Sequence, residues 1–306
     1  RGTWQAFHDP QRDRFTAPFR MTTLRIAGVP EPYNLPWHLG LERRSFIRAK
    51  IALKWRTVPQ GTGAMCELLR KGAIDLAVLV TEGAVRDILC GNPSRIVSPF
   101  VNTPLTWGVH IGAHTALRSP DDLRGVPFAI SRFNSGSHLM SLAYARERGW
   151  ELAEKDLIVV NDLAGAVKRL QEPKPAIFLW EKFITASHVH AGTLRRVDEY
   201  RPSWPCFVVV ARNKVLEEHG DAVQRLMNVV RDQARGLMEK TSAPEMVAQR
   251  YGMSLADAQE WFGNVRWNTE GRVDGDMLRR VARALQNQGS LPQEVDTSDP
   301  GRVGAV

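Results

Sequence analysis

The stretch GTGAMCELLRKGAIDLAVLV, residues 61–80, decides the fold class of this chain. Residues 61–71 predict a helix, Gly72 stands where a helix C-cap belongs, and residues 75–80 form an apolar run of strand length. Two strands and a helix are indicated upstream, at residues 24–28, 51–58 and 37–46. This β-α-β-α-β order predicts a parallel sheet with right-handed crossovers.

A second alternation of strands and helices follows between residues 126 and 180. Extended segments near residues 102–108 and 203–208 flank it and predict two hinge crossings between two lobes. The sequence therefore predicts an α/β protein with two open sheets flanked by helices and a helical carboxyl-terminal segment. The expected parts are an extension at residues 1–21, a first lobe from residues 22–107 and 209–290, a second lobe from residues 108–208, and a loose tail at residues 291–306.

Composition argues against several classes of partner. The 306 residues carry a net charge of +8, but the arginines are scattered and form no basic block. Because no nucleic-acid module is present either, no nucleic-acid partner is expected. No apolar run reaches about 18 residues, so no membrane insertion is expected. The sequence does not determine the oligomeric state.

The cysteines and the amino-terminal sequence indicate in which cellular compartment the protein resides. Cys66, Cys90 and Cys206 lie far apart in apolar contexts, which indicates buried thiols rather than a metal cluster. Unpaired thiols suit a reducing compartment. Residues 1–20 lack the apolar segment of a signal peptide, so a cytoplasmic location is expected. The alternative is a periplasmic protein from which a signal peptide has been removed.

Polar and aromatic residues gather in the turns that follow the predicted strands. Ligands of open α/β folds bind beyond the carboxyl ends of strands, so these turns are expected to line a cleft between the lobes. The structural alternatives are a core position for Trp37 or Trp180 and a helix N-cap at Asn161-Asp162. The expected binding residues in these turns are Asn34, Trp37, His38, Gly61, Thr62, Glu82, Thr106, Asn161, Trp180, Glu181 and Trp204, with Glu31, Gln60 and Trp107 beside them.

The turn SRFNSGSH, residues 131–138, joins an apolar strand to a predicted helix. Unpaired backbone N–H groups and the positive end of the helix dipole meet at such a turn and suit a carboxylate, sulfonate or phosphate. Arg132 adds a planar fork that is always charged. The alternative is an ordinary helix N-cap. The binding residues expected here are Arg132, Asn134, Ser135, Gly136 and Ser137.

Catalytic and metal-binding patterns are weak by comparison. The chain has no G-x-S-x-G elbow, and its histidine pairs, at residues 110 and 114 and at residues 188 and 190, have no acidic residue at motif spacing. No catalytic residue, metal site or cofactor is therefore expected. His38, at the start of a helix near the predicted cleft, is the best-placed histidine.

The chain resembles the type II periplasmic-binding-protein family. The resemblance rests on Pro36-Trp37 after the first strand, on the Leu69–Asp75 run that leads into the third strand, and on Ser119–Gly125 before the second lobe. The resemblance covers residues 22–288. Within the family, the chain is more specifically similar to the branch for nitrate, sulfonate, taurine and thiamine pyrimidine precursors. Within that branch the chain is similar to a non-secreted subgroup that is also found in fungi. The branch's pyrimidine synthases carry a cysteine-rich metal motif that this chain lacks.

Two functions follow from the resemblance and the turns together. The first is a non-catalytic protein that closes two lobes on a small anionic or aromatic-heterocyclic ligand, with an ABC-type permease as partner if the protein is exported. Arg132 and the amides of residues 135–137 would hold an acidic group, Trp37 and Trp180 would stack on the ligand, and Asn34, Thr62 and Glu82 would hydrogen-bond to it. The alternative is an enzyme of pyrimidine or vitamin-precursor metabolism on the same scaffold, with His38 or Lys182 as its reactive group.

Overall fold

Two five-stranded sheets form the centres of two lobes. The computed structural model describes residues 21–298 and residue 304. The first sheet has the order β2-β1-β3-β10-β4, with β10 antiparallel to both neighbours, and the second has the order β7-β6-β8-β5-β9, with β5 antiparallel to both neighbours. The strands are β1 (Thr22–Gly28), β2 (Ile51–Thr57), β3 (Leu76–Val80), β4 (Ser94–Val101), β5 (Trp107–Gly112), β6 (Phe128–Ile130), β7 (Leu157–Val159), β8 (Ile177–Glu181), β9 (Leu194–Tyr200) and β10 (Phe207–Arg212).

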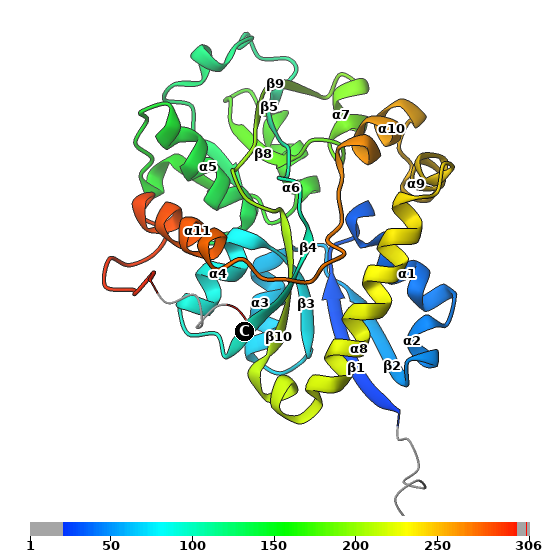
Figure 1. Ribbon diagram of the computed structural model, residues 1–306. Helices are drawn as coiled ribbons and strands as arrows, with labels where there is room; N and C mark the ends of the chain where they lie inside the picture. The colour runs from blue at the N-terminus through cyan, green and yellow to red at the C-terminus, as the bar shows by residue number, and fades with distance from the viewer. Residues whose placement is uncertain (1–20, 299–303, 305–306) are drawn as a thin grey trace, which may run out of the picture.

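Helices cover both faces of each sheet (Figure 1). In the first lobe, α3 and α4 pack on one face of the sheet, and α1, α2 and α8 lie on the other. In the second lobe α5 packs on the face that joins the main core, and α6 covers a smaller apolar cluster around Phe178. The helices are α1 (Leu35–Glu42), α2 (Ser45–Arg48), α3 (Thr62–Arg70), α4 (Thr81–Leu89), α5 (Gly136–Glu147), α6 (Leu163–Leu170), α7 (Ala186–His190), α8 (Asn213–Met238), α9 (Ala243–Tyr251), α10 (Leu255–Asn264) and α11 (Gly275–Asn287), with short 3-10 turns at Pro32–Asn34, Pro120–Leu123 and Glu154–Asp156.

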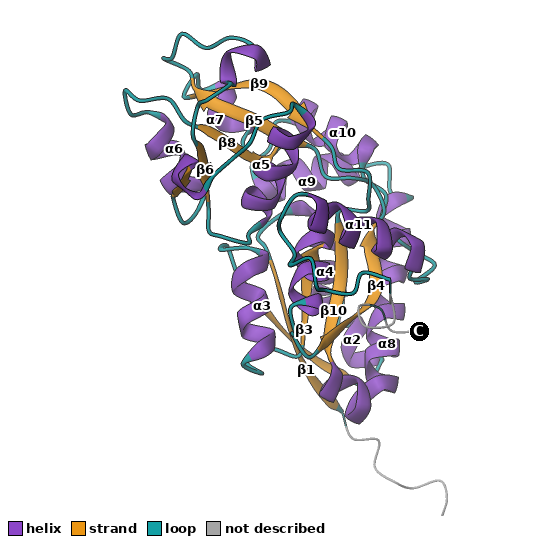
Figure 2. Cartoon of the chain, turned by 90° about the vertical axis from the view of Figure 1, so that its left-hand side faces the viewer, coloured by secondary structure: helices purple, strands orange, loops and turns teal. Residues whose placement is uncertain are grey.

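The predicted fold class is confirmed, because the two sheets are separate and helices flank both. β1 and β6 belong to different sheets, and the chain passes between the lobes at residues 102–106 and 201–206 (Figure 2). None of the described helices combines the length and apolar character needed to cross a membrane. The predicted extension at residues 1–20 lies outside the described residues.

The carboxyl-terminal segment contacts both lobes. After α10 the chain runs beside β4, where Asn102 N donates to Arg266 O at 2.8 Å and Asn268 N donates to Phe100 O at 2.8 Å. α10 itself reaches the second lobe, since the Lys182 ammonium lies 2.8 Å from a Glu260 carboxylate oxygen. This segment therefore adds a third connection to the two predicted crossings.

One local prediction was wrong, and two elements were not predicted. The single helix predicted at residues 37–46 is two helices, because Arg44 has a left-handed backbone with a φ of 53°. α7 and β9 were not predicted, and β9 shows the reason: its sequence LRRVDEY carries four charged residues, because only one of its edges is paired.

Candidate ligand-binding cavity

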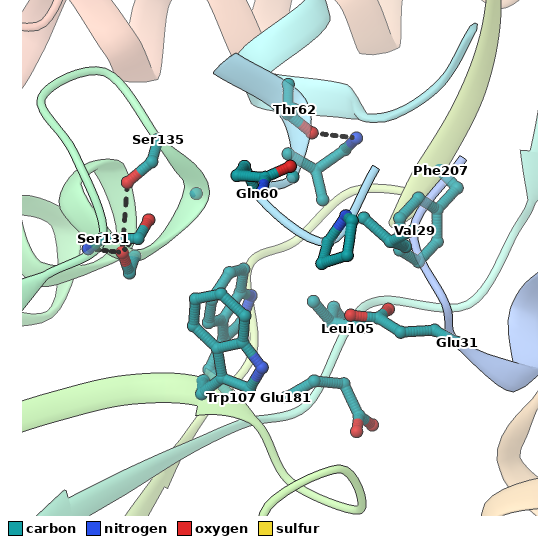
Figure 3. Close-up of a pocket in the computed structure, with 16 residues that line it drawn as sticks. Val29, Glu31, Gln60, Thr62, Leu105, Trp107, Ser131, Ser135, Glu181 and Phe207 are labelled. Atoms are coloured by element: carbon teal, nitrogen blue, oxygen red, sulfur yellow. Dashed lines mark hydrogen bonds between the residues drawn. The ribbon is translucent and has the colours of Figure 1, made fainter. Parts of the chain in front are cut away.

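A cavity lies between the two lobes at the carboxyl ends of their central strands. The space between its lining side chains amounts to about 510 Å³, part of which is open to solvent, and Figure 3 shows these side chains converging from both lobes. β1, β2 and β3 lead into the turns of the first lobe, and β6 and β8 lead into those of the second. The lining residues are Val29, Glu31, Pro59, Gln60, Gly61, Thr62, Val80, Leu105, Trp107, Ser131, Ser135, Gly136, Ser137, Trp180, Glu181 and Phe207.

The structure brings together seven of the predicted binding residues at this cavity. They come from three turns: the start of α3, the start of α5 and the end of β8. The Thr62 hydroxyl accepts a hydrogen bond from Val80 N at 3.1 Å, which ties the start of α3 to the end of β3. The seven residues are Gly61, Thr62, Ser135, Gly136, Ser137, Trp180 and Glu181.

A cluster of three serine hydroxyls forms the second-lobe wall. The Ser137 hydroxyl accepts from Ser131 N at 2.9 Å and lies 3.1 Å from the hydroxyls of both Ser131 and Ser135. Ser135 also caps α5, because its hydroxyl accepts from His138 N. The capping alternative is thus correct for Ser135, and the same turn presents the first backbone N–H groups of α5 to the cavity. A ligand acceptor group can therefore bind at this wall.

Aromatic rings form a second wall. Trp107 opens β5, is 4% exposed, and has an indole N–H without a partner among the described residues. Trp180 is more open and stacks on Phe178 with ring centres 5.2 Å apart. A Cβ at Gly136 would lie 2.9 Å from Cη2 of Trp107, so glycine is needed where α5 meets the indole. Flat indole faces at a partly apolar cavity suit a flat ligand.

Two glutamates from opposite lobes line this space. Glu181 ends β8, and its carboxylate accepts from Phe183 N at 2.9 Å, from Ile184 N at 2.7 Å and from the Tyr33 hydroxyl at 3.2 Å. Burial nevertheless raises the pKa of Glu181 to about 7. Tyr33 belongs to the first lobe, so its bond to Glu181 links the lobes at the cavity.

The Glu31 carboxyl is the other acidic group, and it has no hydrogen bond or ion pair with the described residues. Burial, with a smaller contribution from the nearby Glu181 charge, raises the pKa of Glu31 to about 8. None of the lining residues is Arg, Lys or His. The cavity therefore presents two acidic groups and no cationic side chain to neutralise them.

Glu82 and Trp204 lie outside the lining and bond to each other. The Trp204 indole N–H donates to the Glu82 carboxylate at 2.9 Å, and both residues are buried. Burial raises the pKa of Glu82 to about 7. The pair joins the start of α4 to the second crossing. The predicted direct hydrogen bond from Glu82 to a ligand is therefore not supported by its position.

Five further predicted residues also lie away from the lining, each for a packing reason. Trp37 is fully buried among Phe46, Trp55 and Phe100, so the core alternative is correct for it. His38 packs edge-on against Trp55 at 4.8 Å. The amide of Asn34 donates to Val29 O at 2.8 Å inside the core. The two remaining residues form backbone hydrogen bonds with nearby turns: Thr106 O accepts from Lys182 N, and Asn161 N donates to Ser131 O.

Arg132 and Asn134 face a different cavity. The Arg132 guanidinium donates from Nη2 to Gln60 O at 2.5 Å and so bonds across the two lobes. Both residues line a neighbouring space beside α3 and α4. Asn134 has a left-handed backbone with a φ of 64°, and this bend turns the segment away from the first cavity.

Sequence reasoning missed the apolar part of the lining. Val29 directly follows β1, Val80 ends β3, Phe207 begins β10, and Pro59 and Leu105 lie in connecting segments. The two valines could have been identified in the sequence by their positions at or directly after the end of a predicted strand. Phe207 could not be found in this way, because β10 is antiparallel and its first residue, not its last, reaches the cavity. Among the residues that the structure describes, no group of three or more His, Cys, Asp or Glu is arranged to hold a metal ion.

Two lobes joined by two crossings, with a cavity between the sheets, are the architecture of the periplasmic-binding-protein fold, and comparison with solved structures agrees. The chain has the type II periplasmic-binding-protein fold, as its sequence resemblance implied. The Candida albicans CA3427 gene product, described as exhibiting the generic periplasmic binding protein fold, superposes with a TM-score of 0.84 at 22% identity, over 90% of this chain and 93% of that one. Residues 107–200 match the model of the Ca3427-like PBP family.

Two bacterial structures share the fold at lower similarity. The alkanesulfonate-binding protein SsuA from Xanthomonas axonopodis pv. citri, bound to MOPS, has a TM-score of 0.74 at 17% identity, over 93% of this chain and 98% of that one. The nitrate-binding protein NrtA from Synechocystis has a TM-score of 0.66 at 15% identity, over 93% of this chain and 86% of that one. No curated protein sequence matches the chain significantly.

Proposed function

We propose that this protein binds a small molecule in the cavity between its lobes, as a solute-binding protein does. The observation that carries the proposal is the cavity of about 510 Å³, which turns from both lobes line at the carboxyl ends of their strands. That edge is where open α/β folds bind ligands. Lobe closure by rotation about the two crossings is the motion that such an arrangement allows.

The lining favours a flat ligand that carries a cationic or hydrogen-donating nitrogen group. Glu31 has no partner among the described residues, and Glu181 lies close enough to raise the pKa of Glu31. A carboxylate that is largely removed from water is costly unless a cation or donor pairs with it, so a ligand amidinium or ammonium would reduce this cost at the half-buried Glu31. The indoles of Trp107 and Trp180 would add stacking and cation–π attraction. Of the two expected ligand classes, the aromatic heterocycle fits this lining better.

The anionic class receives support from a different part of the cavity. The first turns of α3 and α5 face the space and offer backbone N–H groups. The Xanthomonas and Synechocystis structures are of proteins named for alkanesulfonate and nitrate, both anions. Here, however, Arg132 lies outside the lining, and an anion would approach two acidic groups. An acceptor group on the ligand would therefore bind at the serine wall, opposite the two glutamates.

Calorimetric titration with three matched probes tests the proposal. Benzamidinium, benzyl alcohol and benzenesulfonate share one ring and differ in charge. Benzamidinium is expected to bind, and Glu31→Gln is expected to weaken it about tenfold, since a charge-assisted bond contributes about 1.5–3 kcal/mol. The exposed Glu217→Gln serves as the control. Preferential binding of benzenesulfonate would refute the cationic class. Native mass spectrometry that finds no co-purified molecule, together with failure of every probe, would refute binding at this cavity.

The enzyme alternative receives less support from the positions of its two candidate groups. His38 packs on Trp55, and the Lys182 ammonium lies between the carboxylates of Glu199 and Glu260, at 2.9 and 2.8 Å. Neither residue lines the cavity. A binding protein returns its ligand unchanged, so recovery of a chemically altered ligand after incubation would favour the enzyme.

The compartment and the transport partner are part of the same proposal. Cys66 and Cys206 are buried free thiols, as expected, whereas Cys90 is free but exposed, so the prediction of a buried thiol was wrong for it. Unpaired thiols support a reducing compartment such as the cytoplasm. The Staphylococcus aureus structure with this fold is titled as the ligand-binding component of an ABC-type import system. An exported form of this protein would accordingly have an ABC-type permease as its partner. Fractionation of the native host, with mass analysis of the thiols, distinguishes the two locations.

A further inference from the structure

A second cavity lies on the seam between the lobes, beside the first. It spans about 680 Å³, part of which is open to solvent, and is lined by α3 and α4 of the first lobe and by residues 132–134 of the second. Gly63 forms part of its floor, and a Cβ at that position would lie 3.7 Å from Nη2 of Arg132. The two lobes thus meet here where Gly63 of the first lobe lies beside the Arg132 guanidinium of the second.

Three guanidinium groups line this seam cavity, and each has only part of its donors engaged. Arg70 pairs with Asp87 through Nη2 at 2.5 Å. Arg86 donates from Nε to Ser290 O at 2.9 Å, and Arg132 donates from Nη2 to Gln60 O at 2.5 Å. A guanidinium has five N–H donors, so each group retains donors for another acceptor.

The acidic groups of the seam cavity are already engaged. One Asp87 oxygen accepts from Arg70, and the other accepts from the Asn92 amide at 2.5 Å. Glu67 is largely exposed and pairs with Lys71. The three arginines therefore outnumber the two acids, and neither acid is free to neutralise Arg86 or Arg132.

An exposed aromatic ring stands at the edge of the same cavity. Phe133 is 44% exposed, although it is a large apolar side chain, and it packs edge-on against His138 at 5.4 Å. One face of this ring is open to a flat group that would lie beside the arginines. A cationic cluster with an adjacent open ring suits a phosphorylated ligand with an attached base.

We propose that the seam cavity binds a diphosphate group, held between Arg70 and Arg86 of the first lobe and Arg132 of the second. Arginine pairs with phosphate oxygens through two parallel bonds, and three such groups match a multiply charged oxyanion. The diphosphate would bridge the lobes. Both inorganic pyrophosphate and a nucleoside diphosphate carry this group, and Phe133 favours the second. The proposal does not depend on what binds in the first cavity.

Titration of the full chain with inorganic pyrophosphate and with ADP, at low salt, tests the proposal. One equivalent of pyrophosphate is expected to bind, and Arg86→Gln and Arg132→Gln are each expected to weaken it at least about tenfold, or about 1.4 kcal/mol. The exposed Arg124→Gln is the control and leaves binding unchanged. Circular dichroism confirms that each variant is folded. If one variant does not fold, Arg70→Gln replaces it.

Two further variants locate the bound group. Trp180→Ala alters the first cavity and is expected to leave pyrophosphate affinity unchanged. ADP is expected to bind more tightly than pyrophosphate, and Phe133→Ala is expected to remove that advantage. Equal affinities would assign the site to the diphosphate group alone and still support it. Absence of binding at millimolar pyrophosphate, equal weakening by Arg124→Gln, or loss of binding in Trp180→Ala would overturn the proposal.

Discussion

Replacement of Glu31 by glutamine tests the acidic pair in the unliganded protein, through the pH dependence of stability. The pKa of Glu31 is raised from its ordinary 4.5 to about 8, so the native protein holds a proton that the unfolded chain has lost between these pH values. Folding stability therefore falls as pH rises through this window, by up to about 1.4 kcal/mol per pH unit. A glutamine amide cannot titrate, and the Glu31→Gln variant loses this dependence.

The range from pH 6.5 to 8 isolates the effect. His110 and His138 have pKa values lowered to about 4, so they titrate below this range in the native protein, while the unfolded histidines, with an ordinary pKa of 6.5, lose their remaining protons within it. This contribution is the same in wild type and in the variant, and it cancels in their comparison. Across the range Glu31 alone accounts for a loss of about 1.6 kcal/mol. This corresponds to about 3–6 °C in Tm for a chain of this size. Glu181 and Glu82, with pKa values of about 7, add to the loss in both proteins.

Thermal melting of wild type, Glu31→Gln and the exposed control Glu217→Gln at both ends of the range measures this difference. The variant is expected to match wild type near pH 6.5, where Glu31 is protonated, and to melt at a higher temperature near pH 8. Affinity for benzamidinium moves in the opposite direction and rises about tenfold across the range, because the ligand requires the ionised carboxylate. Parallel melting curves for wild type and Glu31→Gln would refute the reasoning, and so would an affinity that falls as pH rises.

Three other substitutions test the contacts around the cavity. Trp204→Phe removes the donor to the buried Glu82 and is expected to cost about 1–3 kcal/mol in denaturant unfolding, with a smaller loss at a pH where the carboxyl is protonated. Gly136→Ala places a methyl group 2.9 Å from Trp107 Cη2 and is expected to weaken benzamidinium about tenfold in calorimetry while Tm changes little. Lys182→Met breaks partly exposed ion pairs to β9 and α10, and is expected to cost about 1 kcal/mol and to speed amide hydrogen exchange in α10.

The alternation of strands and helices could be predicted because each depends on a local pattern. β3 is a continuous apolar run, and Gly72 ends α3 with a φ of 69°, as its C-cap position indicated. β9 could not be found locally, because a charged edge strand is stabilised by its pairing with β5 rather than by its own sequence.

The binding residues could be predicted only in part, since a turn fixes a position but not the direction of a side chain. Thr62, Ser137 and Glu181 face the cavity because they stand at strand ends or helix starts. Arg132 belongs to the same turn as Ser135, yet its long side chain reaches across to Gln60 O and leaves the cavity lining. Trp37 follows the first strand closely, but α1 directs its indole into the core.

The Tyr33 hydrogen bond connects ligand charge to lobe geometry. Tyr33 belongs to the first lobe, packs against Phe207 and Trp261 at 5.0 and 5.1 Å, and accepts a bond from Trp267 through its carbonyl, so its position is fixed. Its hydroxyl donates to Glu181 of the second lobe. A hydrogen bond to an ionised carboxylate is about twice as strong as one to a neutral acceptor. A cationic ligand of the proposed class would stabilise the ionised form of Glu181, and it would therefore strengthen the bond that links the two lobes.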